Sequence, residues 1–136
     1  MISYDSNLLI YFLESHPEFG QTAREILLSH SNSGVVLSTL VIQEVLTGFA
    51  LRGDNSEATA RRMLDTLEYT EFVPVSKQIT EEAVRLTVKY GRKILGYDSI
   101  HLATSIVSGA NVFYTNDKQL LSAGVEEVNI RAIEKI

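Results

Sequence analysis

Cysteine is absent from the chain, and its 12 basic residues are outnumbered by 17 acidic ones. The lack of cysteine excludes disulfides and thiolate metal sites, and it fits the reducing cytoplasm in which we expect the protein. No apolar run approaches the roughly 20 residues that a membrane-spanning helix needs. Because the chain begins at once with strand-like residues, we also expect no signal peptide.

The shortage of basic residues gives a net charge of −5, which is the wrong sign for a protein that coats nucleic acid non-specifically. An enzyme that holds phosphate through a metal ion is still compatible with this charge, since the ion inverts the local field. An acidic surface also suits a basic segment of a partner protein.

The length of 136 residues and a hydrophobic content of 45% predict one domain over residues 1–136 with a substantial core. We find no internal repeat and no low-complexity segment. The polar stretch at 53–56 is interpreted as an ordinary loop rather than a domain boundary.

Short apolar strands alternate with helices along the chain, and this order predicts an α/β fold with a parallel sheet covered on both faces. Pro74 places the third strand at an edge or at a strand end. We expect caps at Ser6 or Asn7, at Ser38 or Thr39, and at Thr80. The expected strands are 2–4, 35–37, 72–75, 112–114 and 127–130, and the expected helices are 8–13, 21–30, 40–52, 57–67, 81–90, 97–107 and 118–123.

Four acidic residues lie beside these apolar elements although they are far apart in sequence: Asp5, Glu44, Asp98 and Asp117. Asp5 directly follows the first expected strand and Asp117 follows the fourth by three residues, so both fall on the carboxyl edge of a parallel sheet, where ligands bind. Carboxylates and water form the usual shell of Mg²⁺ or Mn²⁺. The four acids therefore predict a shared site for a divalent cation.

Each acid also has an ordinary structural interpretation. Asp5 lies in good turn chemistry, and Asp98 and Asp117 are placed where a helix cap would be. Glu44 is the most telling of the four, because apolar residues surround it in a helix. The functional interpretation gains weight because all four can share one edge of the sheet.

Several polar residues near the acids carry weaker signals. His101 is one turn after Asp98, and we favour a structural or surface role for it over contact with substrate. Ser6, Asn7 and Thr115 are interpreted as turn and cap residues that can also hydrogen-bond a metal-bound group. A solvated helix face is the safer interpretation of most basic residues, although they can also steer RNA: Arg52, Arg61, Arg62, Arg92 and Lys93.

Four segments together resemble the PIN-domain nucleases, in particular the VapC-type toxin ribonucleases. They are Tyr-Asp-Ser-Asn at 4–7, Ser-Thr-Leu-Val-Ile-Gln-Glu at 38–44, Tyr-Asp-Ser-Ile-His-Leu-Ala at 97–103 and Thr-Asn-Asp at 115–117. The resemblance extends over nearly the whole chain, in length as well as in the order of elements. Each segment alone is weakly specific, whereas their order and separation together are fairly specific.

The resemblance implies a three-layer α/β/α sandwich around a mostly parallel sheet. It also implies that Asp5, Glu44, Asp98 and Asp117 bind Mg²⁺ or Mn²⁺ and direct water at an RNA phosphodiester. Ser6 and Thr115 match the small hydroxyl residues beside that cluster. Toxins of this type pair with an antitoxin that covers the site, and they commonly form homodimers. A housekeeping PIN-domain nuclease is the alternative within the family.

Two other function classes are open to the sequence. A phosphatase or receiver domain also places an aspartate after its first strand, but Asn7 stands where such a phosphatase needs a second aspartate, and residues 75–77 offer no receiver acid. A binding domain without activity would keep the acids as a structural ion site. For the homodimer we expect an apolar face, with candidates Ile10, Tyr11, Phe12 and Phe49.

Overall fold

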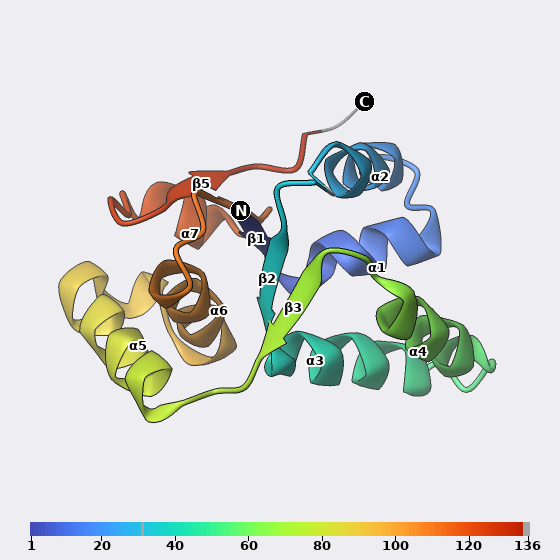
Figure 1. The fold of residues 1–136 in the computed structure, drawn as a ribbon, viewed down its shortest axis with the longest axis horizontal. Coiled ribbons are helices and arrows are strands. Elements are labelled where there is room, and N and C mark those ends of the chain that lie inside the picture. Colours follow the sequence, from blue (N-terminus) through green and yellow to red (C-terminus); the bar gives the residue numbers. More distant parts are fainter. Residues whose placement is uncertain (31, 135–136) are drawn as a thin grey trace.

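The computed structural model describes residues 1–30 and 32–134. At its centre lies a five-stranded sheet in which all neighbouring strands are parallel, in the order β3-β2-β1-β4-β5 (Figure 1). The strands are β1 (Ile2–Tyr4), β2 (Val35–Ser38), β3 (Thr70–Val73), β4 (Val112–Tyr114) and β5 (Asn129–Arg131). The expected order of strands and helices is confirmed.

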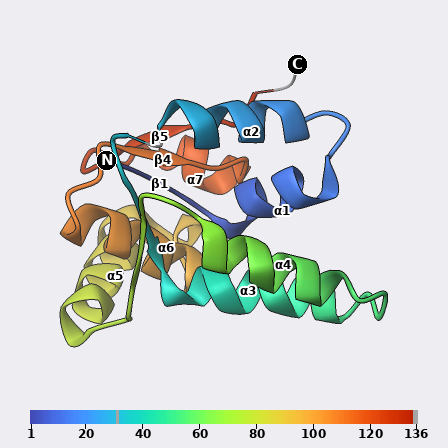
Figure 2. The same ribbon diagram turned by 45° about the vertical axis from the view of Figure 1, so that its right-hand side comes forward.

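The helices pack in pairs against the sheet, as Figures 1 and 2 show from two directions. The first four lie together, with α1 against α2 and α3 against α4, while α5 packs against α6. Their bounds are α1 (Ser6–Glu14), α2 (Gly20–Ser29), α3 (Thr39–Ala50), α4 (Ser56–Thr66), α5 (Lys77–Tyr90), the short 3₁₀ helix η1 (Gly91–Lys93), α6 (Gly96–Val107) and α7 (Lys118–Ser122).

Two apolar cores lie on the two faces of the sheet. Neighbouring residues of β4 point to opposite sides, so Tyr114 joins the core built with α1 to α4, whereas Phe113 joins the core built with α5, α6 and α7. Phe113 is fully buried and Tyr114 nearly so. Helices on both faces make the three-layer α/β/α arrangement that the sequence predicts.

The third strand differs from the prediction by two residues. It ends at Val73, directly before Pro74, because proline has no N–H for the ladder. β3 is also an edge strand of the sheet, as the proline indicated.

Two of the three expected helix caps are wrong. Asp5, not Ser6 or Asn7, caps α1, since its Oδ1 accepts a 3.1 Å hydrogen bond from the backbone N–H of Asn7. Ser76, not Thr80, caps α5, and the Thr80 hydroxyl instead donates to the Ser76 carbonyl. The real cap of α1 is one or two residues earlier than the sequence pattern suggested, and that of α5 is four residues earlier. Ser38 caps α3 as expected.

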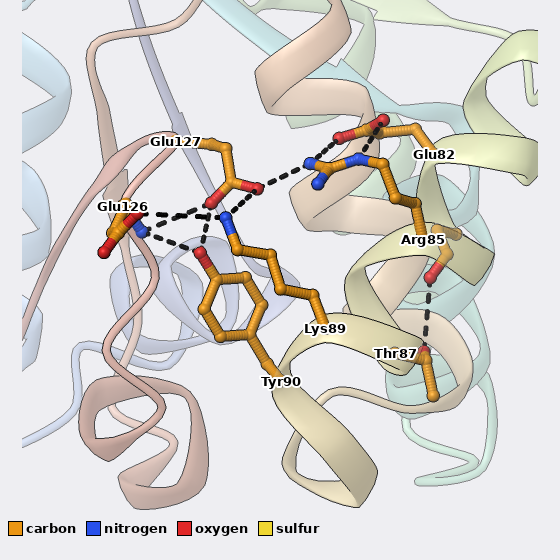
Figure 3. A network of polar contacts seen from close by, with 8 residues as sticks. Glu82, Arg85, Thr87, Lys89, Tyr90, Glu126 and Glu127 are labelled. Atoms are coloured by element: carbon orange, nitrogen blue, oxygen red, sulfur yellow. Dashed lines mark hydrogen bonds and ion pairs between the residues drawn. The ribbon is translucent and has the colours of Figure 1, made fainter.

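An ion-pair network fastens the C-terminal half of α5 to the segment before β5 (Figure 3). The carboxylate of Glu127 accepts hydrogen bonds from the Tyr90 hydroxyl and from Arg85, and Lys89 lies 3.4 Å away. Arg85 also pairs with Glu82 within its own helix. None of the helices formed by the described residues is long and apolar enough to cross a membrane.

Candidate active site

The sheet brings Asp5 and Asp117 to one edge, as predicted. β1 and β4 are parallel neighbours, and Asp5 follows the first while Asp117 follows the second by three residues. The backbone N–H of Asp5 donates a 3.2 Å hydrogen bond to the carbonyl of Tyr114, which holds the two strand ends together. The loops that follow β1 and β4, which carry Asp5 and Asp117, therefore start next to each other.

Thr115 joins these two segments from a fully buried position. Its hydroxyl donates a 2.5 Å hydrogen bond to Oδ2 of Asp5 and accepts one of 3.0 Å from the backbone N–H of Asp117. The other oxygen of Asp5 is occupied by the cap of α1. Thr115 thus sets the orientation of the Asp5 carboxylate and the path of the chain at Asp117.

Asp98 lies in the first turn of α6, close to both of these acids. Its pKa is raised to about 6, first by burial and then by the negative charges of Asp117 and Asp5, while His101 acts in the opposite direction. Such coupling requires the three carboxylates to be near one another. The structure therefore gathers Asp5, Asp98 and Asp117, which come from three separate parts of the chain.

Asp5 is itself almost completely buried, with 5% of its surface exposed. Burial raises its pKa, the Thr115 hydrogen bond and the His101 ring lower it, and the charge of Glu44 raises it again. Glu44 therefore belongs to the same electrostatic neighbourhood, reached from α3 rather than from a strand end.

Glu44 is held by His101, a residue that carried only a weak signal in the sequence. Nε2 of His101 donates a 2.5 Å hydrogen bond to Oε1 of Glu44, which links α6 to α3. His101 is only 2% exposed, so the surface role is excluded and its contact is with a predicted site acid. Its position one turn after Asp98 was the available signal, since residues at that spacing share a helix face.

Ser6 is buried in the first turn of α1, directly after Asp5. Within the described ranges, its hydroxyl makes no hydrogen bond to any of the four acids. Asp117 caps α7 through Oδ1, which accepts from the N–H groups of Gln119 and Leu120. The structural interpretation of Asp117 as a cap is thus correct, and it leaves Oδ2 for another partner.

The donors suit a hard divalent cation, because they are carboxylate oxygens gathered in a partly buried position. Among residues 1–30 and 32–134, no three acidic or histidine side chains are placed so that they would ligate one ion directly. Mg²⁺ usually keeps several waters and takes one or two protein carboxylates, so it does not need such a cage. The raised pKa of Asp98 reflects its burial and the negative charges of Asp117 and Asp5 beside it.

A family model described as the PIN domain matches residues 2–126. The chain belongs to the PIN-domain family. The match includes Asp5, Glu44, Asp98 and Asp117. A search of curated proteins found no match for this PIN domain.

Solved structures share the PIN fold over almost their whole length. VapBC2 from Rickettsia felis bound to a promoter DNA fragment has a TM-score of 0.73 and 19% identity, covering 97% of this chain and 98% of that one. VapC20 from Mycobacterium tuberculosis, described as a sarcin-ricin loop cleaving toxin, has a TM-score of 0.71 and 22% identity, covering 95% and 99%. FitAcB from Neisseria gonorrhoeae has a TM-score of 0.72 and 18% identity, covering 96% of both chains. At such identities the likeness establishes the fold.

Proposed function

We propose that this PIN domain, taken as one unit over residues 1–136, is an endoribonuclease that needs Mg²⁺ or Mn²⁺. The observation that carries the proposal is the gathering of Asp5, Asp98 and Asp117 at the carboxyl edge of the sheet, with Glu44 beside Asp5. Carboxylates that repel one another are stable together when a cation joins them. Asp5, Glu44, Asp98 and Asp117 would hold that cation, in part through water.

When bound, the cation would polarise the phosphodiester and lower the pKa of a bound water. The protein supplies the fixed positions around it. Thr115 orients Asp5, the cap of α7 orients Asp117, and the first turn of α6 presents Asp98. Because each carboxylate is held by a different element, little reorganisation is required when substrate arrives.

For the RNA itself, two exposed basic residues shortly before α6 support a path along η1. Arg92 and Lys93 form η1 shortly before the helix that carries Asp98. We assign them to the RNA backbone, since phosphates are commonly contacted by flexible basic side chains. Arg52 has a different role, because it pairs with Glu14 and lies 4.4 Å over the ring of Phe49.

The likeness to toxin–antitoxin complexes supports a cytoplasmic toxin that is held inactive by an antitoxin. One similar structure is described as a toxin–antitoxin complex from Klebsiella pneumoniae, with a TM-score of 0.66 and 21% identity. An antitoxin arginine placed among the acids would satisfy their oxygens with bidentate hydrogen bonds and exclude the metal. A housekeeping nuclease with the same active site is the alternative, and it would have no such partner.

A homodimer is the remaining part of the proposal, but its face differs from the one we expected. Phe49 is 5% exposed and belongs to the core, and Ile10, Tyr11 and Phe12 pack partly buried against that core. A groove of about 570 Å³ between α5 and α6 is lined by apolar residues, among them Val84, Val88 and Tyr97. Because this face offers both a hollow and the exposed side chains of Val84 and Val88, we assign it to a second copy.

Cleavage of RNA in the presence and absence of chelator tests the enzymatic proposal. Activity should require Mg²⁺ or Mn²⁺ and should stop in EDTA. Asp5→Asn, Glu44→Gln and Asp98→Asn should each lower turnover by about 100-fold or more, as loss of electrostatic stabilisation usually does. Asp117→Asn should cost less, because asparagine keeps the cap of α7. Wild-type turnover by Asp98→Asn, or cleavage that persists in excess chelator, would show that the site is wrongly assigned.

A further inference from the structure

One buried contact at the site is not explained by packing alone. His101 is 2% exposed, yet its Nε2 is directed at Oε1 of Glu44, whose side chain is 30% exposed. Nδ1 of the same ring is buried and has no hydrogen-bond partner in the described part of the chain. A buried polar atom without a partner is costly, so an apolar residue would be cheaper here if His101 served only to fill space.

We propose that His101 is a positioning residue that holds Glu44 in the orientation needed to receive a divalent cation, and this rests on the nuclease proposed above. The contact uses Oε1, which leaves Oε2 of Glu44 for the ion or for its water. His101 would not touch substrate. It would act through Glu44, as residues behind a metal-binding carboxylate do in general.

Glu44 needs such support more than the other acids do. Asp5 has a short side chain fixed by Thr115 and by the cap of α1. Glu44 has one more rotatable bond and comes from α3, whereas Asp98 comes from α6. Holding a glutamate in one rotamer costs conformational entropy. The rigid ring of His101, itself fixed by burial, holds Glu44 in that rotamer before the ion binds, so binding does not have to lower the entropy of the side chain again.

Three variants separate positioning from space filling. His101→Gln keeps an N–H donor at about the reach of Nε2, so it can still hold Glu44. His101→Leu fills similar space without a donor. Tyr97→Phe is the matched control, because the Tyr97 hydroxyl makes a second polar contact between α6 and α3, 3.4 Å from Oε1 of Gln43. It tests whether loosening the two helices alone affects the ion.

The measurement is the melting temperature of each protein as a function of Mg²⁺ concentration, which requires no substrate. Mg²⁺ stabilises the folded state by RT ln(1 + c/Kd), where c is the Mg²⁺ concentration, so a fit of the rise gives Kd. The midpoint below means this Kd, the Mg²⁺ concentration at which half of the folded protein holds the ion. We expect the midpoint of His101→Leu to lie about tenfold or more above that of the wild type, as for loss of other residues behind metal ligands. His101→Gln should stay within about threefold, and Tyr97→Phe should match the wild type.

A double-mutant cycle shows whether His101 acts through Glu44. In the Glu44→Gln background, adding His101→Leu should change the Mg²⁺ midpoint little further, because the residue that it positions is already lost. Equal changes in both backgrounds would contradict positioning. If His101→Leu does not fold, His101→Asn is measured in its place, since its shorter side chain cannot reach Glu44.

Other outcomes overturn the inference in distinguishable ways. An unchanged midpoint for His101→Leu together with a raised one for Asp98→Asn would leave the metal site intact and remove His101 from it. A lower midpoint for His101→Leu would mean that the ring competes with the cation. An unchanged midpoint for Asp98→Asn would remove the proposed function itself, and the positioning role with it.

Discussion

The hydroxyl of Thr115 donates a 2.5 Å hydrogen bond to the carboxylate of Asp5 across 110 residues of sequence. The two residues meet because β1 and β4 are parallel neighbours, so whatever follows one strand lies beside whatever follows the other. The same hydroxyl accepts from the N–H of Asp117. One small side chain therefore connects two of the four acids proposed to bind the cation.

Thr115→Val should damage both stability and activity. Valine keeps the shape but removes the donor to Asp5 and the acceptor for Asp117, and a buried group left without its partner costs about 1 to 3 kcal/mol. The pKa of Asp5, already raised by burial, should rise further because the hydrogen bond lowers it. We expect turnover to fall by about tenfold or more. Turnover is measured in a cleavage assay, and the loss of stability is measured by chemical denaturation of the same variant.

Thr104→Val is the matched control for that change. Thr104 is also fully buried, but its hydroxyl donates to the carbonyl of Ile100 within α6 rather than to one of the acids. It should lose stability without a comparable loss of turnover per folded molecule. If both variants lost activity equally, the Thr115 hydrogen bond would have no special place in the site.

The sequence predicts the fold well because hydrophobic periodicity and turn residues are local signals. It correctly places Asp5 and Asp117 at one edge, since that follows from the order of the strands alone. The caps at Asp5 and Ser76 were missed because several hydroxyl and acidic residues lie within one turn, and backbone geometry decides between them. His101 was undervalued because its partner Glu44 is 57 residues away on another helix, and no local pattern reports such a contact.

The face proposed for the dimer can be tested with two equally exposed apolar residues. Val88 on the groove is 81% exposed, and Leu51, after the end of α3, is 82% exposed. A glutamate buried in an interface is unfavourable, so Val88→Glu should give a monomer in light scattering at micromolar concentration. Leu51→Glu should keep the mass of the wild type. A dimer that survives Val88→Glu would place the interface elsewhere, and a monomeric wild type would refute the dimer.

Glu127 should make the protein sensitive to acid. Partial burial alone would raise its pKa, but hydrogen bonds from Tyr90 and Arg85 outweigh this and bring the pKa to about 2, against an ordinary 4.5. The stability that these contacts provide is thus fully present above pH 4.5 and is lost as the pH falls toward 2. Glu127→Gln should cost roughly 1 kcal/mol at pH 7, after discount for solvent screening, and almost nothing near pH 2.

Glu126→Gln serves as the control for Glu127. The side chain of Glu126 is 81% exposed and pairs loosely with Lys89 at 3.8 Å. Exposed pairs of this kind contribute little. Urea denaturation of both variants from pH 2 to pH 7 is the measurement. If Glu127→Gln lost the same stability at every pH, packing of the Glu127 side chain, rather than its charge, would fasten α5 to the segment before β5.

Because burial and the neighbouring acids both disfavour the charged carboxylate, Asp98→Asn should be more stable than the wild type when no metal is present. The folded pKa of Asp98 is about 6 and its ordinary value 3.8, so the folded state prefers the protonated acid. The stability linked to that proton is fully present below pH 3.8 and is lost as the pH rises through 6. Asparagine imitates the protonated form at every pH. Its advantage in EDTA should therefore grow from near zero at pH 4 to about 1 kcal/mol at pH 7, since Asp98 is only half-buried.

Magnesium should reverse this order. The ion binds the folded wild type and raises its melting temperature, and it should raise that of Asp98→Asn less, because one carboxylate is missing. Asp65→Asn, a change at an exposed acid of α4, should melt like the wild type with and without Mg²⁺. Melting curves of the three proteins in EDTA and in Mg²⁺ decide the matter. Equal shifts by Mg²⁺ in the wild type and Asp98→Asn would mean that the acids share no cation, and that their gathering at the sheet edge serves another purpose.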